Sequence, residues 1–95
     1  MTKLNKAVAK IQKAVDELEK TILTKDEKVL SVSSINQLSK FKESFLTVLR
    51  LIQSDNIPPR NERFLGIARV IVEQWPFNLE LGSIIIDAEQ AYKEI

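Results

Sequence analysis

Apolar residues near the start of the chain recur at the spacing of one helix face. After Leu4, each next apolar position follows by four, three, four, three and four residues, ending at Ile22. The series is Leu4, Val8, Ile11, Val15, Leu18 and Ile22. This spacing predicts an amphipathic helix over 3–24 that lies along other helices. Thr2 precedes it as a candidate N-cap.

A second helix is predicted over 34–54. Ser34 and Gln37 fit a capping box, and an apolar helical period begins directly after them. The apolar face of this helix consists of Ile35, Leu38, Phe41, Phe45, Val48, Leu49 and Ile52. It faces the same interior as the first helix.

The connector over 24–33 has some predicted structure of its own. Thr24 and Glu27 also fit a capping box, which favours one short helical turn. We expect the apolar residues that follow to cover one end of the bundle. They are Val29, Leu30 and Val32.

Two further helices are predicted on either side of Pro76. The third spans 59–75, because Pro59 suits the first turn of a helix. Its circumference is apolar nearly all round, which indicates a helix that is central or covered by something else. The fourth spans 78–94, with Asn78 as its cap. Its main stripe is Leu81, Ile84, Ile85, Ala88, Ala91, Tyr92 and Ile95.

The four predicted helices indicate an all-α fold, an antiparallel four-helix bundle with short connections. The length of 95 residues suits one domain, spanning 1–95. A chain of this size buries somewhat over ~60% of its unfolded surface, so it folds alone but has little room for a cleft. We expect Phe45 and Trp75 to be well buried.

Composition excludes several kinds of chemistry. The chain contains no cysteine and no histidine, so disulfides, thiolate nucleophiles and histidine-based metal sites or triads are ruled out. We therefore expect neither an enzyme nor a bound cofactor. The net charge is +1, without the basic excess typical of nucleic-acid binders. No run approaches the ~20 apolar residues of a membrane span, so a small, soluble cytoplasmic protein is expected.

The strongest functional signal is a surplus of apolar residues in the last third of the chain. Trp75 and Phe77 flank Pro76, and Leu79 and Ile86 project away from the main stripe of the fourth helix. Aromatic anchors beside exposed aliphatic side chains are typical of protein interfaces. The alternative is that the core requires these side chains and that Leu79 and Ile86 are scattered surface residues.

Two sets of basic residues are further candidates. Arg60 and Arg63 lie at the mouth of the predicted third helix, where they suit docking of an anion or carboxylate. A basic stripe on the first helix lies away from its apolar seam and consists of Lys3, Lys6, Lys10 and Lys13. The alternative for both sets is solvation, with the acidic C-terminal segment complementing the lysines.

These features predict a small non-enzymatic helical protein-binding module acting through the third and fourth predicted helices. It is an inhibitor, adaptor, immunity-type or accessory factor, with a protein partner or self-association as a homodimer. The alternative is an accessory nucleic-acid-associated protein that uses the basic stripe with Arg60 and Arg63. In size, charge balance and predicted helix count, the chain resembles the small cytosolic immunity proteins of bacteriocin producers. No motif carries this resemblance, so it assigns no residue a role.

Overall fold

The computed structural model describes residues 2–95, which form helices and contain no strand. The all-α prediction is therefore confirmed. The elements are α1 (Lys3–Thr24), α2 (Glu27–Leu30), α3 (Ile35–Gln53), the 3₁₀ turn η1 (Arg60–Glu62), α4 (Ile67–Gln74) and α5 (Glu80–Lys93). Among these described residues, no helix is both long and apolar enough to cross a membrane.

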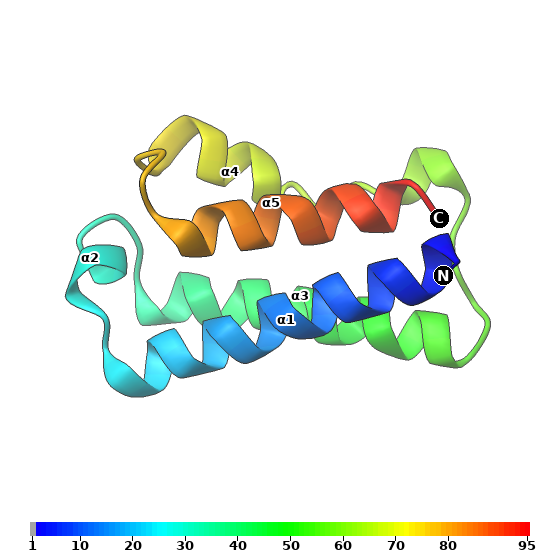
Figure 1. The fold of residues 1–95 in the computed structure, drawn as a ribbon, viewed down its shortest axis with the longest axis horizontal. Helices are drawn as coiled ribbons and strands as arrows, with labels where there is room; N and C mark the ends of the chain where they lie inside the picture. Colours follow the sequence, from blue (N-terminus) through cyan, green and yellow to red (C-terminus); the bar gives the residue numbers. More distant parts are fainter. Residues whose placement is uncertain (1) are drawn as a thin grey trace.

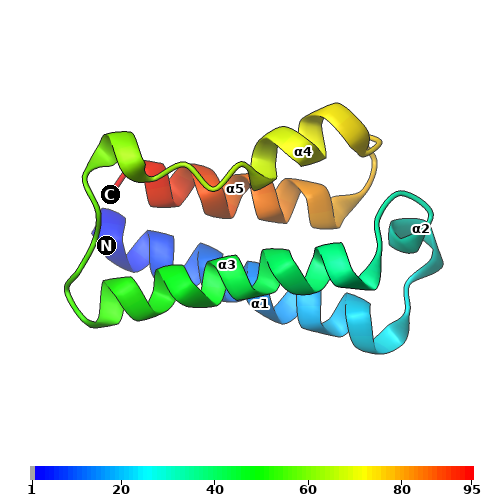
Figure 2. The same cartoon turned by 180° about the vertical axis from the view of Figure 1, so that it is seen from behind.

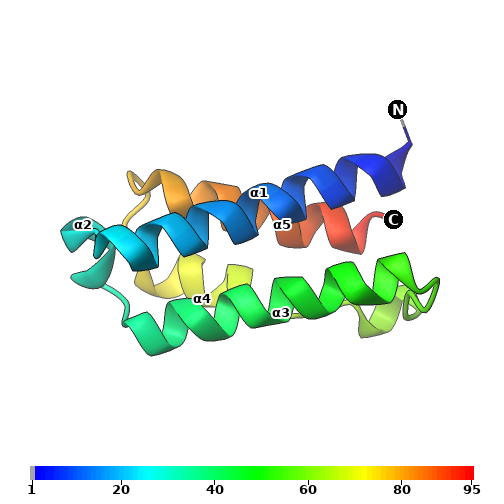
Figure 3. The same ribbon diagram turned by 90° about the horizontal axis from the view of Figure 1, so that it is seen from below.

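The helices pack in an up-and-down arrangement (Figure 1). The first helix, α1, packs against both α3 and α5 and is antiparallel to each, while α4 lies against α5. The same neighbours are seen from behind and from below (Figures 2 and 3). The start of α1 and the end of α5 lie at the same end of the bundle, and α2 covers the other (Figure 1).

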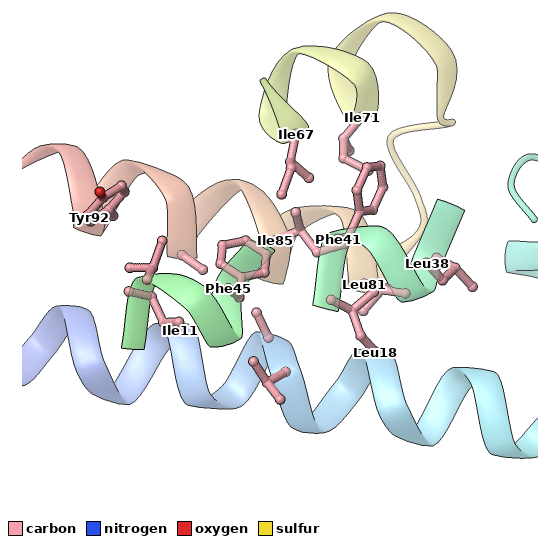
Figure 4. Close-up of a cluster of buried hydrophobic side chains, with 14 of the residues drawn as sticks. Ile11, Leu18, Leu38, Phe41, Phe45, Ile67, Ile71, Leu81, Ile85 and Tyr92 are labelled. Carbon is pink, nitrogen blue, oxygen red and sulfur yellow. The ribbon is translucent and has the colours of Figure 1, made fainter. Parts of the chain in front are cut away.

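The core is a single cluster to which every α-helix contributes. Phe45 and Ile11 are fully buried at its centre, and Ile85 and Tyr92 face them from α5 (Figure 4). Burying a side chain of this size contributes about 1.5–3 kcal/mol each, which makes the core the main source of stability. The predicted burial of Phe45 and Trp75 is confirmed. Val29 is also buried, and Leu30 and Val32 pack against the cluster, as predicted for the connector.

Two of the predicted helix caps are present. The Thr2 hydroxyl accepts a hydrogen bond from the Asn5 N–H at 3.1 Å, and the Ser34 hydroxyl accepts one from the Gln37 N–H at 3.0 Å. These caps satisfy donors that the first turn of a helix leaves unpaired. The helix bounds predicted for these two segments agree with α1 and α3.

The cap predicted for α2 was wrong. Asp26, not Thr24, caps this short helix: its carboxylate accepts hydrogen bonds from the N–H groups of Lys28 and Val29 at 3.0 and 3.4 Å. The Thr24 hydroxyl donates instead to the Lys20 carbonyl at 2.9 Å, within α1. Thr24 is still part of α1, so it cannot begin the next helix.

The predicted third helix over 59–75 was too long, because α4 begins only at Ile67. Residues 60–62 form the 3₁₀ turn η1, and Gly66 adopts a left-handed backbone with a φ of 79°. The N–H of Leu65 is bound by the Glu89 side chain at 3.2 Å rather than by a helical carbonyl. The chain before α4 is therefore a non-helical strap, residues 63–66, that runs back along the bundle (Figure 2).

The predicted start of the fourth helix was also displaced. Asn78 lies in a turn in which the Leu79 N–H donates to the Pro76 carbonyl at 3.3 Å. The helix α5 begins at Glu80, with Leu79 as its cap residue and no side-chain cap. Asn78 cannot cap α5 because the turn already fixes it one residue too early.

Candidate protein-binding surface on α4 and α5

The helix α4 presents opposite faces to the core and to solvent. Ile67 and Ile71 are buried and point toward Phe41 and Ile85 (Figure 4). Trp75, at the end of the helix, is only 5% exposed. Val72 lies on the outward side and is 57% exposed, which is unusual for a large aliphatic side chain. The helix therefore contributes both to the core and to an apolar surface.

A small hollow of about 50 Å³ lies between α4, α5 and the turn that joins them. Its lining is Ile71, Val72, Trp75, Pro76, Phe77, Leu79, Gly82, Ser83 and Ile86. Gly82 allows the close approach of the two helices, because a Cβ atom there would lie 3.0 Å from Cγ2 of Ile71. We call this hollow, with the exposed side chains beside it, the α4–α5 surface.

Phe77 is the most exposed large apolar residue of the α4–α5 surface. It is 92% exposed and lies at the tip of the turn between α4 and α5. Its ring makes no contribution to the core cluster. Contact with a partner would remove most of this apolar area from water, which is worth about 1.5–3 kcal/mol for a phenylalanine.

The structure brings four of the predicted partner-binding residues together around one hollow. Phe77 forms an exposed edge, and Leu79 and Ile86 are half-buried in the lining. Trp75 forms the wall, and its indole Nε1 is buried with no hydrogen-bond acceptor among the described residues. Leu79 and Ile86 also pack against the core cluster, so they serve both the core and this lining.

Arg60 and Arg63 lie at the opposite end of the bundle from Phe77, near the C-terminal end of α5 (Figure 1). The prediction that they lie at the mouth of the third helix was wrong, because α4 begins four residues after Arg63. Arg60 is exposed. Arg63 is half-buried and makes internal bonds: Nε donates to the Pro58 carbonyl at 2.8 Å and Nη1 to the Ile95 oxygen at 2.6 Å. Its guanidinium thus anchors the strap to the end of the chain.

The basic stripe on α1 lies beside α5. Lys3, Lys6 and Lys13 are exposed and Lys10 is half-buried. Lys10 and Lys13 share a depression of about 120 Å³ with Ile84 and Asp87. Asp87 is the acidic residue of this lining, and no ion pair joins it to either lysine among the described residues.

Sequence reasoning missed the role of Glu89. This residue is only 1% exposed, and its carboxylate accepts hydrogen bonds from the N–H groups of Leu65 and Ala68 at 3.2 and 2.8 Å. Lys93 Nζ lies 3.5 Å from the same carboxylate. The available signal was helical spacing, because Glu89 follows Ile85 by four residues and therefore shares its inward face.

Two other interactions surround the strap. The ammonium group of Lys93 lies 5.2 Å from the centre of the Phe64 ring, within the range of a cation–π contact. Burial raises the pKa of the Tyr92 hydroxyl above its usual value, and the nearby charge of Arg63 acts in the opposite direction. Lys93 on α5 thus contacts Phe64 of the strap.

A wider cleft of about 330 Å³ lies between the end of α1, α2 and the start of α5. Its charged lining is of both signs, with Glu17, Lys20, Asp26, Lys28 and Glu80. This mixture does not select an anion or a cation. No group of three or more acidic side chains within residues 2–95 is arranged to hold a metal ion.

A scan against protein-family models and a search of curated proteins each found no match to this chain.

Proposed function

We propose that this protein is a small non-enzymatic, helical protein-binding module that acts through the α4–α5 surface. Such a module is an inhibitor, an adaptor, an immunity-type protein or an accessory factor. One observation carries the proposal: Phe77, 92% exposed, borders a hollow that Trp75, Leu79 and Ile86 also line. Exposed apolar side chains gathered around a concave site are typical of an interface.

The size of the hollow favours a protein partner over a small molecule. Ligand pockets enclose about 300–1,000 Å³, whereas this hollow has about 50 Å³. A space of that size accepts part of one protruding side chain. Phe77 and Val72 extend the apolar contact beyond its rim. A partner would therefore insert one apolar side chain and cover the two exposed ones.

The nucleic-acid alternative has less support from the arrangement of charges. Asp87 shares the depression of Lys10 and Lys13, and Arg63 bonds to backbone oxygens of its own chain. A nearby carboxylate and the bonded carbonyl oxygens lower the positive potential that these basic side chains offer to phosphates. Arg60 comes from η1 rather than from α1, so it does not extend the row of lysines along that helix.

The proposal is tested by capturing partners from native lysate on immobilised protein. Wild type is compared with Phe77→Ala, and with Leu23→Ala as the matched control, because Leu23 is 75% exposed on α1 outside the hollow. We expect a protein that wild type and the control retain and Phe77→Ala loses. Equal retention by all three would place the interface elsewhere.

Two further measurements separate the alternatives. Binding of a DNA duplex or a single strand at low salt, falling steeply as salt is added, would favour the nucleic-acid function. Sedimentation at micromolar concentration tests self-association: a dimer that Phe77→Ala dissociates would identify a second copy of this chain as the partner.

A further inference from the structure

The helix α4 is attached to the bundle differently from the other long helices. It has 8 residues, compared with 22 in α1, 19 in α3 and 14 in α5. Its backbone lies close to α5, whereas α1 packs along both α3 and α5. Short helices with few packed neighbours open locally at a lower free energy than the helices of the core.

Both ends of α4 are breaks in the regular backbone. Gly66 precedes it with a φ of 79°, and Trp75 follows with an extended backbone before Pro76. Glycine at such a position tolerates large changes in its torsion angles. The helix can therefore move away from α5 between Gly66 and Pro76, as an element between two hinges does. An isolated helix of 8 residues is marginal in water, so the hydrogen bonds within α4 break once it leaves α5.

One buried side chain provides the polar attachment of α4 to α5. Glu89 accepts the N–H of Ala68 in the first turn of α4 and the N–H of Leu65 in the strap. No other side-chain hydrogen bond within residues 2–95 joins α4 to α5. Hydrogen bonds to an ionised carboxylate are stronger than neutral ones, and a negative charge is favourable at a helix N-terminus.

The closed position of α4 also leaves one buried donor unpaired. No described group accepts a hydrogen bond from the indole Nε1 of Trp75. A buried donor without a partner destabilises the closed position, because it can form a hydrogen bond to water only when the site opens. This effect acts against the apolar contacts of Ile67 and Ile71 and against the bonds to Glu89.

We propose that α4 is a hinged flap that opens from α5 between Gly66 and Pro76, and that Glu89 is the latch that keeps it closed. The flap opens and closes in the protein without a partner. Its effect on binding rests on the proposed function, in which Ile71, Val72 and Trp75 form the α4 side of the hollow. Opening the flap removes these three side chains from the α4–α5 surface.

Native-state hydrogen exchange on the full chain, with no partner present, tests this proposal. We expect the amides protected within α4, such as that of Trp75 bonded to the Ile71 carbonyl, to exchange through a local opening. That opening is more populated than the global unfolding that exposes the central amides of α1 and α3, and it depends less on denaturant. If the α4 amides follow the same global event as α1 and α3, the flap is ruled out.

Glu89→Gln identifies the latch, with Asp87→Asn as the matched control on the exposed side of α5. We expect Glu89→Gln to accelerate exchange in α4 by about 10- to 100-fold relative to α1 and α3, and the control to leave this ratio unchanged. Equal acceleration in all helices would show that Glu89 is only a core residue. Because this experiment needs no partner, it can fail while the capture experiment succeeds, and the reverse also holds.

Discussion

The Glu89 carboxylate on α5 accepts a hydrogen bond from the backbone N–H of Ala68, in the first turn of α4, at 2.8 Å. The second oxygen of the same carboxylate accepts the N–H of Leu65 at 3.2 Å. A side chain of one helix thus caps another, which explains why α4 starts where it does. It also fixes the position of the α4–α5 surface, because Ile71 and Val72 follow on the same short helix.

Replacing Glu89 with alanine is expected to destabilise the protein by about 2–3 kcal/mol, because it leaves the N–H groups of Leu65 and Ala68 without an acceptor. Urea denaturation measures the loss. Glu94→Ala is the control, since this carboxylate on the following turn is exposed. A change under about 0.5 kcal/mol for Glu89→Ala would show that these bonds contribute little.

Ile71→Ala and Val72→Ala are expected to differ strongly although the residues are neighbours. Ile71 is 4% exposed and packs in the core, so its truncation costs about 2–5 kcal/mol. Val72 points outward, and its truncation changes stability by less than about 0.5 kcal/mol. Thermal or urea unfolding of both variants checks this. Similar losses of stability would contradict the finding that α4 turns Ile71 to the core and Val72 to solvent.

Gly82→Ala tests the close approach of α4 and α5. Alanine favours a helix by about 1 kcal/mol over glycine, but the new Cβ atom would lie 3.0 Å from Cγ2 of Ile71. We expect the clash to prevail, with a net loss of about 1 kcal/mol. In an Ile71→Leu background, which lacks that methyl group, Gly82→Ala should be less harmful. An equal effect in both backgrounds would rule out the contact.

Stability is expected to fall with increasing pH as tyrosine ionises. Burial raises the pKa of Tyr92 above its usual value, with the charge of Arg63 opposing the shift. Above a pH of about 10, the unfolded chain therefore loses this proton before the folded protein does, which favours unfolding. Tyr92 is the only tyrosine, so Tyr92→Phe removes the whole tyrosine contribution. Denaturation at pH values of about 9 and 11 should show a smaller decline for Tyr92→Phe than for wild type; equal declines would contradict the assignment.

The sequence was sufficient to predict α1 and α3, because the patterns that mark these long helices are local. The apolar spacing from Leu4 to Ile22, and the cap at Ser34, depend on residues within a few positions of one another. The start of α4 depends on Glu89, which is 21 residues from Ala68 in the chain. The preference of Pro59 for the first turn therefore predicted helix over 59–66, where a long-range contact and a left-handed Gly66 prevent it.

The candidate surface was partly predictable for the same reason. Trp75, Phe77, Leu79 and Ile86 lie around one helix–turn–helix, so sequence proximity brought them to one hollow. The position of Arg63 depends on the path of the strap, which no local pattern encodes. Its bonds to Pro58 and Ile95 place it at the other end of the bundle.

The affinity of the captured partner, once purified, is the measurement that tests the α4–α5 surface most directly. Titration calorimetry of wild type, Phe77→Ala and Leu23→Ala compares two highly exposed apolar residues in different places. We expect Phe77→Ala to weaken binding by about tenfold or more and to reduce the negative heat-capacity change. Leu23→Ala should bind as wild type does. Unchanged binding by Phe77→Ala, or an equal loss with Leu23→Ala, would contradict the account.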